Sequence, residues 1–277
     1  MGTVESTKEE MKDNAQRWIV KLGRFGYAAK GIVYIVIGIL AINLAAGARN
    51  TKVGSEQALK TIVQQPMGQI LLAIVGIGLA GYMIWKLSEA IVDPEHNGTD
   101  PKGLVKRAGD AASGIGYGSI AFSAFQILIG HPSNAGGKSP QGWTAMLMSH
   151  PWGRYAVIAA GLFAAGIAFS NFYIAYKTTF KDKLKTGGLD ENQVTMIERL
   201  GQLGYGARGV VLLIIAYFLI EAAWTYDPKK AGGLTQALRA LADQPYGVWL
   251  LGIVAAGFVA YGVLMIVMAR YKRIYLD

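Results

Sequence analysis

Residues 22–31 read LGRFGYAAKG, and residues 200–209 read LGQLGYGARG. The two segments align without a gap, 178 residues apart. A more diverged copy, RAGDAASGIGY at residues 107–117, aligns with residues 24–34. A second marker follows each copy: QPMG at 65–68, HPWG at 150–153 and QPYG at 244–247. The chain therefore contains three internal repeats, a feature that has to be identified before any fold is assigned.

The composition indicates a membrane protein. Of the 277 residues, 52% are hydrophobic and 16% are charged, whereas soluble domains have about 25% charged residues. Four windows contain no Asp, Glu, Lys or Arg and approach or exceed the roughly 20 residues that cross a bilayer: residues 67–85, 111–130, 155–176 and 244–269. Shorter apolar segments at residues 32–46 and 209–220 complete six predicted spans, two per repeat. The predicted fold class is all-α.

The distribution of basic residues predicts the topology. Six spans place both termini on one side of the membrane, and that side holds 19 of the 27 Lys and Arg residues. The positive-inside rule then places both termini in the cytoplasm. The basic residues that give the net charge of +9 are thus mostly explained by the membrane topology. We therefore expect no nucleic-acid partner. With no signal peptide recognised at the start, the first span is expected to act as the insertion signal, and the absence of cysteine excludes disulfides and thiolate sites.

Short helices are predicted at both membrane surfaces. Before the first span, apolar residues three or four apart with cations beside them favour a separate helix in the headgroup layer: Met11, Ala15, Trp18, Leu22 and Phe25. On the opposite side, residues 54–65 and 233–244 share a pattern that predicts two short helices. Interfacial anchoring is the expected role of Trp85, Trp143, Trp152, Trp224 and Trp249.

The even-numbered spans are rich in small residues, which let helices pack closely in lipid. We assign this packing role to Gly76, Gly78, Gly81, Gly161, Gly166 and Gly257. Residues 76–81 also match the dinucleotide-binding pattern G-x-G-x-x-G, but that motif requires a strand-to-helix turn, and here it lies within a span. Because every repeat has two spans, all copies insert in the same orientation. This predicts a pseudo-threefold ring of three parallel two-helix repeats about the membrane normal.

One membrane domain is expected over residues 1–277, with repeats at 18–92, 101–177 and 194–271. Three motifs recur in or mark these repeats: the related segments at 24–31 and 202–209, the sequence Q-P-x-G before two of the even-numbered spans, and G-x-x-G-Y at 78–82. This combination resembles the bacterial family of six-span membrane proteins of unknown function built from three two-helix repeats. The resemblance covers roughly residues 18–271 and implies the six-span fold and the bacterial cytoplasmic (inner) membrane, without any activity.

Four residues form a tentative binding site. Lys30 and Arg208 occupy equivalent positions at the cytoplasmic mouths of the first and fifth spans, and Ser113 is the neutral third position. Cations within a membrane are functional candidates, so these residues could converge near the axis and bind an anion or a lipid phosphate. Alternatively, both long side chains extend to the headgroups.

Glu221 is the fourth candidate and lies near the outer end of the fifth span. Its counterpart in the first repeat is Asn43, and Gln126 is close to the same position in the third span. These residues could form a small polar cluster inside the bundle that accepts a proton or binds a cation. The alternative is an ordinary interfacial or interhelical hydrogen bond.

No catalytic residue, metal ligand or cofactor motif is predicted. His131 and His150 flank the outer loop of the middle repeat, but each lies beside a proline without a nearby carboxylate, so we expect no metal there. Because the sequence has no recognisable nucleophile or metal motif, we expect that the protein is not an enzyme.

Two functions remain open from the sequence. The favoured one is a structural or protein-interaction component of the bacterial cytoplasmic membrane. Membrane lipids are its expected partners, and a membrane-protein partner is a further candidate. The small-residue helices and the absence of catalytic motifs favour it. The alternative is a transporter or a lipid- or anion-binding protein with a site near the pseudo-threefold axis.

Overall fold

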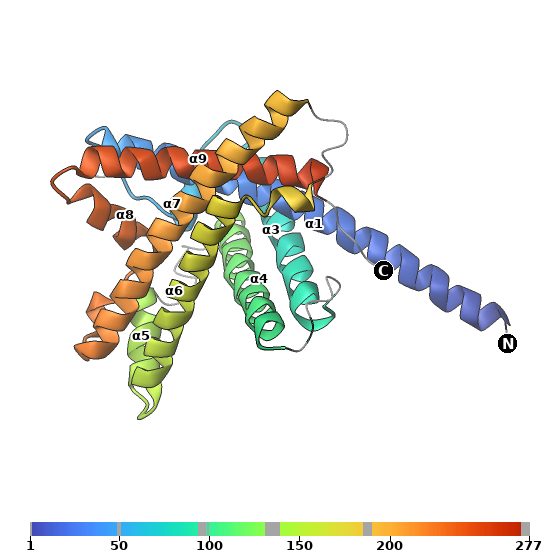
Figure 1. Ribbon diagram of the computed structural model, residues 1–277, viewed down its shortest axis with the longest axis horizontal. Coiled ribbons are helices and arrows are strands. Elements are labelled where there is room, and N and C mark those ends of the chain that lie inside the picture. Colours follow the sequence, from blue (N-terminus) through green and yellow to red (C-terminus); the bar gives the residue numbers. More distant parts are fainter. Residues whose placement is uncertain are drawn as a thin grey trace.

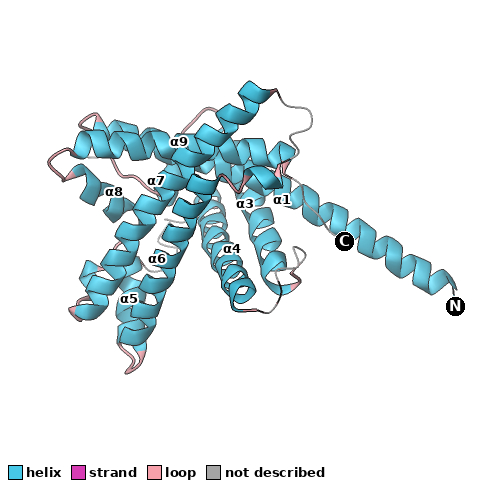
Figure 2. Ribbon diagram, in the orientation of Figure 1, coloured by secondary structure: helices cyan, strands magenta, loops and turns pink. Residues whose placement is uncertain are grey.

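The structure, a computed structural model, describes residues 2–48, 51–93, 98, 100–130, 139–184 and 190–272. In these ranges the chain is helical (Figure 2), apart from loops and an isolated bridge between Leu184 and Lys272. Six helices are long and apolar enough to cross a membrane. They are α1 (Gly2–Ala45), α3 (Gly68–Ile91), α4 (Pro101–Leu128), α6 (Gly153–Lys177), α7 (Glu191–Trp224) and α9 (Gly247–Tyr271). The all-α, six-span prediction is confirmed.

A short helix connects the two spans of each repeat: α2 (Ser55–Val63), α5 (Pro140–Met148) and α8 (Leu234–Ala242). Two 3-10 turns, η1 (Lys181–Lys183) and η2 (Pro228–Lys230), complete the described elements. The predicted helices at residues 54–65 and 233–244 are confirmed. Both turn an apolar face inward, burying Leu59 in α2 and Leu238 in α8. The sequence analysis did not single out α5.

The predicted separate headgroup helix before the first span is wrong. The chain forms one continuous helix from Gly2 to Ala45, and the N-terminal part of α1 projects beyond the rest of the molecule in Figure 1. The glycines at the entry to this span do not interrupt the helix. A glycine within a helix costs only about 1 kcal/mol, and Gly23 and Gly26 give room to Trp85 and Tyr82 of α3.

The six spans pack in the ring order α4–α3–α1–α9–α7–α6. Each even span packs on the odd span of the next repeat: α3 on α4, α6 on α7, and α9 on α1. In Figure 1, α6 runs alongside α7, α3 runs beside α4, and α7 passes across α9. This recurrence is the predicted pseudo-threefold arrangement of parallel repeats.

The ring is open at one point. The two spans of the first repeat, α1 and α3, pack together, as do α7 and α9 of the third. Among the described residues, the equivalent contact between α4 and α6 of the middle repeat is nearly absent, and Figure 1 shows these helices diverging. The threefold arrangement therefore lacks one of its three within-repeat interfaces.

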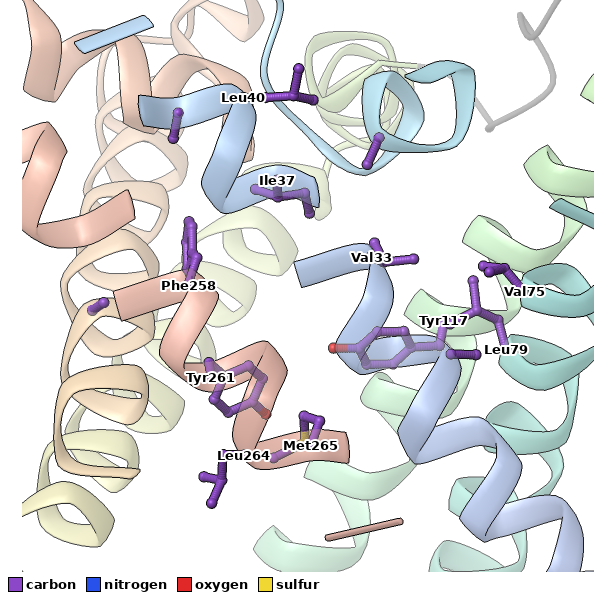
Figure 3. Packing of buried hydrophobic residues seen from close by; sticks show 14 of the residues in the cluster. Val33, Ile37, Leu40, Val75, Leu79, Tyr117, Phe258, Tyr261, Leu264 and Met265 are labelled. Atoms are coloured by element: carbon purple, nitrogen blue, oxygen red, sulfur yellow. The ribbon is translucent and has the colours of Figure 1, made fainter. Parts of the chain in front are cut away.

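The core lies where α1, α3 and α9 meet. Figure 3 shows Val33 and Ile37 of α1 among core residues of α9, including Phe258, and of α3, including Leu79. Trp85 is also buried here, only 1% exposed, so its predicted role as an interfacial anchor is wrong. Trp143, Trp152, Trp224 and Trp249 are exposed.

Close helix contacts depend on glycine. A Cβ atom built on Gly31 would lie 2.6 Å from the carbonyl oxygen of Gly262, and one on Gly262 would lie equally close to that of Gly31. Five of the glycines assigned to packing also face a neighbouring span: Gly76, Gly78, Gly81, Gly161 and Gly257. Gly166 is the exception, because a Cβ there would meet no described atom within 4 Å. The packing role is therefore not found at Gly166, which faces an open space between α6 and α4.

Candidate functional site

A cavity of about 910 Å³ lies inside the ring, and all six spans contribute to its wall. Repeat-equivalent positions converge on it. Five triplets, taken from the first, second and third repeats, all line the cavity: 27, 110 and 205; 30, 113 and 208; 82, 167 and 261; 86, 171 and 265; 89, 174 and 268. The cavity therefore lies on the pseudo-threefold axis.

Lys30 sits in a cage of tyrosines on this axis. Its ammonium lies 4.7 Å from the ring centroids of Tyr82 (α3) and Tyr117 (α4), and 5.3 Å from that of Tyr261 (α9). It also donates a hydrogen bond of 3.1 Å to the Tyr82 hydroxyl. Aromatic faces attract cations at such distances. Lys30 is only 3% exposed, so its side chain points into the bundle and not toward the headgroups.

Arg208 approaches the same cage from α7. Its guanidinium donates a hydrogen bond of 3.0 Å to the Tyr261 hydroxyl and lies 5.4 Å from the centroid of that ring. The tyrosines also brace one another edge to face, with Tyr82 contacting Tyr117 and Tyr205 contacting Tyr261. Such pairs fix ring orientation, so the cage is a rigid wall for the two cations.

A second group of charges lies beside the cage. Lys86 (α3) pairs with Glu89 of the same helix and, at 2.8 Å, with Asp110 of α4. Lys272, just after α9, lies 3.5 Å from Glu89 and donates a hydrogen bond of 2.7 Å to the Tyr27 hydroxyl. Both carboxylates of the cavity are therefore held by cations other than Lys30 and Arg208.

The cavity carries excess positive charge. Among the described residues, its lining includes five cations, Lys30, Lys86, Lys106, Arg208 and Lys272, and two carboxylates, Glu89 and Asp110. Within the described ranges, neither Lys30 nor Arg208 has a carboxylate at ion-pair distance. An uncompensated cation in a low-dielectric interior is costly. The arrangement thus provides a place for an anion.

A buried polar group points to the same conclusion. Asn171 of α6 lines the cavity and is 3% exposed, yet its Nδ2 has no hydrogen-bond partner among the described atoms. Buried amide donors are nearly always paired. Ser113 of α4 also lines the cavity and adds a hydroxyl. An anion in the cavity would find neutral donors as well as charges.

Glu221 does not belong to this site. It is 13 residues from Arg208 along α7, about 20 Å at the rise of an α-helix, and pairs at 2.9 Å with Lys230 of η2. This hydrogen bond raises the pKa of Lys230. Asn43, its counterpart, is exposed, so the predicted polar cluster does not form. Of the two histidines considered, His150 lies near Trp152, and His131 is outside the described residues.

Several residues of the site were missed in the sequence. Tyr82 and Tyr261 are repeat equivalents, each ending a small-residue segment, and that recurrence could have marked the cage. The repeat equivalents Lys86, Asn171 and Met265 are three different residue types, so no shared pattern marks them in the sequence, yet all three line the cavity. Their dissimilarity is itself informative, because it makes the three walls chemically different.

The fold and cavity define a class: a six-span integral membrane protein with an internal threefold repeat and a cationic axial cavity. Comparison with known proteins identifies the family. The model of the Domain of Unknown Function DUF1206 matches residues 25–93, 108–178 and 203–272, and the chain belongs to this family.

One relative is the uncharacterized protein YxxB of Bacillus subtilis (strain 168). It is 34% identical over 273 residues, which span 99% of this chain and 98% of the relative. No solved structure matches the chain significantly.

Proposed function

We propose that the protein binds a phosphate-bearing anion in the axial cavity. The observation that carries the proposal is that two cations, Lys30 and Arg208, face one cavity with no carboxylate of the described chain at ion-pair distance. Arginine suits phosphate because its planar guanidinium donates two parallel hydrogen bonds. The small-residue helices and the absence of catalytic motifs favoured a structural role from the sequence; the cavity supports the alternative of a lipid- or anion-binding protein.

The cavity is large enough for more than an ion. Sites for small molecules have volumes of about 300–1,000 Å³, and this cavity has about 910 Å³. Apolar side chains, including Phe163, Ile167 and Met265, line it together with the cations. This mixture suits a ligand with both a charged group and an apolar part.

The first prediction concerns binding. Arg208→Gln and Lys30→Met should each weaken binding of dihexanoyl phosphatidylglycerol by tenfold or more, since a hydrogen bond to a charged group contributes about 1.5–3 kcal/mol. Isothermal titration with the purified full chain in detergent measures this. Both variants should stay folded because neither substitution leaves a carboxylate unpaired.

Matched controls are Arg239→Gln and Lys60→Met, which remove cations from α8 and α2, outside the cavity lining. They should leave affinity unchanged. Equal affinity in the wild type, Arg208→Gln and Lys30→Met would refute the proposed site.

We further propose that the protein lies in the bacterial cytoplasmic membrane with both termini in the cytoplasm, so that the cavity's charged end faces the cytoplasm. The bias of Lys and Arg toward that side supports this orientation. The cations of the cavity would then lie near the cytoplasmic leaflet.

The second prediction tests orientation. Because the chain lacks cysteine, Glu56→Cys on α2 and Glu191→Cys at the start of α7 each introduce one exposed thiol. A membrane-impermeant maleimide applied to intact cells should label Glu56→Cys, and should label Glu191→Cys only after permeabilisation. The reverse pattern would invert the topology.

A further inference from the structure

We infer that the ligand is a membrane lipid with an anionic phosphate headgroup, which enters sideways through the opening between α4 and α6. The inference rests on the anion site proposed above and names the source of the phosphate. Four observations carry it: the missing helix contact, the depth of the cavity, the order of its polarity, and two glycines that face open space.

The cavity reaches the outer surface of the bundle between α4 and α6. Val105 of α4 and Leu162 of α6 both line it, and both are largely exposed, at 64% and 60%. These are the two spans whose within-repeat contact is nearly absent among the described residues. In a membrane, the surroundings of this opening are lipid, so a lipid can enter there without crossing the aqueous phase.

The cavity also extends deep into the apolar region. On α6 its lining runs from Leu162 to Ile174, a length of about 18 Å at 1.5 Å per residue. That is more than half of the roughly 30 Å hydrocarbon core of a bilayer. A free phosphate ion would occupy only the charged end of the cavity, whereas a lipid would also fill its apolar length.

Polarity changes along the cavity in the order that a lipid requires. On α6 the deep positions are apolar, at Leu162, Phe163 and Ile167, whereas Ser170 and Asn171 lie toward the end that holds the cations. Acyl chains favour the first environment and a headgroup the second. The open sides of α4 and α6 thus offer a path for a chain, with the phosphate directed at Lys30 and Arg208.

Gly109 and Gly166 leave room for this path. They lie on α4 and α6, and both line the cavity. A Cβ atom built on either glycine would have no described atom within 4 Å. In the outer repeats, the equivalents of Gly109 pack tightly instead: Gly26 against Tyr82, and Gly204 against Tyr261. The middle repeat therefore has free volume where its counterparts have a helix contact.

The test uses the full chain in phosphatidylcholine nanodiscs containing a phosphatidylglycerol with a photoreactive group on its acyl chain. Cross-links should concentrate on the α4 and α6 residues of the cavity. Gly109→Leu and Gly166→Leu should fit without displacing the backbone and fill the opening, lowering these cross-links about tenfold. Binding of glycerol 1-phosphate, which has no chain, should stay within about twofold of wild type.

Gly116→Leu on α4 and Gly252→Leu on α9 are matched controls, because these glycines also face open space but do not line the cavity. They should leave the cross-links unchanged. Cross-links spread evenly over the six spans, or unaltered in Gly166→Leu, would overturn lateral lipid entry while leaving the anion site intact. If instead Arg208→Gln changed neither cross-linking nor glycerol phosphate binding, the anion site itself would be refuted.

Discussion

Replacing Glu89 with glutamine should destabilise the protein by about 3–5 kcal/mol, the usual effect of removing one partner from a buried ion pair. Glu89 is 2% exposed and faces both Lys86 and Lys272. In Glu89→Gln, Lys86 still has Asp110. The physical reason is that Glu89 places a buried negative charge beside Lys86 and Lys272, and glutamine removes this charge while both cations remain.

Thermal unfolding of the purified protein in a single detergent measures this change. The control is Glu56→Gln, which breaks the pair with Lys60 on α2, where both side chains are about half exposed. Exposed pairs contribute at most about 1 kcal/mol, so the control should unfold near the wild-type temperature. Similar unfolding temperatures for all three proteins would show that Glu89 does not hold the cavity wall together.

The substitution Gly262→Ala is expected to cause a second large loss of stability. The new methyl group would lie 2.6 Å from the carbonyl oxygen of Gly31 and 2.7 Å from a side-chain carbon of Ile35. Because one of these neighbours is backbone, α1 and α9 must move apart. Overpacking of this kind costs about 1–3 kcal/mol, and the adjacent cage residue Tyr261 should shift as well, weakening ligand binding.

Gly252→Ala provides a comparison on the same helix. It lies ten residues earlier in α9 and has open space at its Cβ position. Replacing an unconstrained helical glycine with alanine stabilises a helix by roughly 0.5–1 kcal/mol. Gly252→Ala is therefore expected to raise the unfolding temperature and Gly262→Ala to lower it. Equal shifts for the two variants would mean that the α1–α9 contact is looser than described.

The sequence was sufficient for the spans and for the order of the repeats. Charge-free windows such as residues 67–85 and 244–269 report directly that a segment prefers lipid, and two spans per copy force a parallel arrangement. The neighbours of each span could not be predicted in this way. In a bilayer, hydrophobicity does not distinguish one helix face from another, so side-chain fit selects the partner.

The opening between α4 and α6 illustrates this limit. In the outer repeats, Gly78 faces Ala29 and Gly257 faces Ala207, which brings the two spans of each repeat together. The middle repeat has Phe163 at the equivalent glycine position, and a bulky ring there prevents the same approach. The substitution is visible in the sequence, but its effect depends on a contact that only the three-dimensional arrangement reveals.

The candidate site was predictable in part. Repeat equivalence placed Lys30, Ser113 and Arg208 together, and all three line the cavity. Glu221 was misplaced because a polar residue within a span was taken to face inward, whereas Lys230 outside the span holds it. Lys86, Glu89 and Lys272 were missed. Ionisable residues near helix ends ordinarily reach the membrane surface, so their positions in the sequence do not mark a buried site.

The packing of α1 against α9 has a consequence for biosynthesis. Of the six spans, the one synthesised first, α1, has its principal neighbour in the one synthesised last, α9. Among the described residues, the two spans of the middle repeat barely touch each other, so α4 packs mainly on the first repeat and α6 on the third. The middle hairpin therefore gains its packing from its neighbours, and the axial chamber, to which all six spans contribute, is completed only when the last of them is in place.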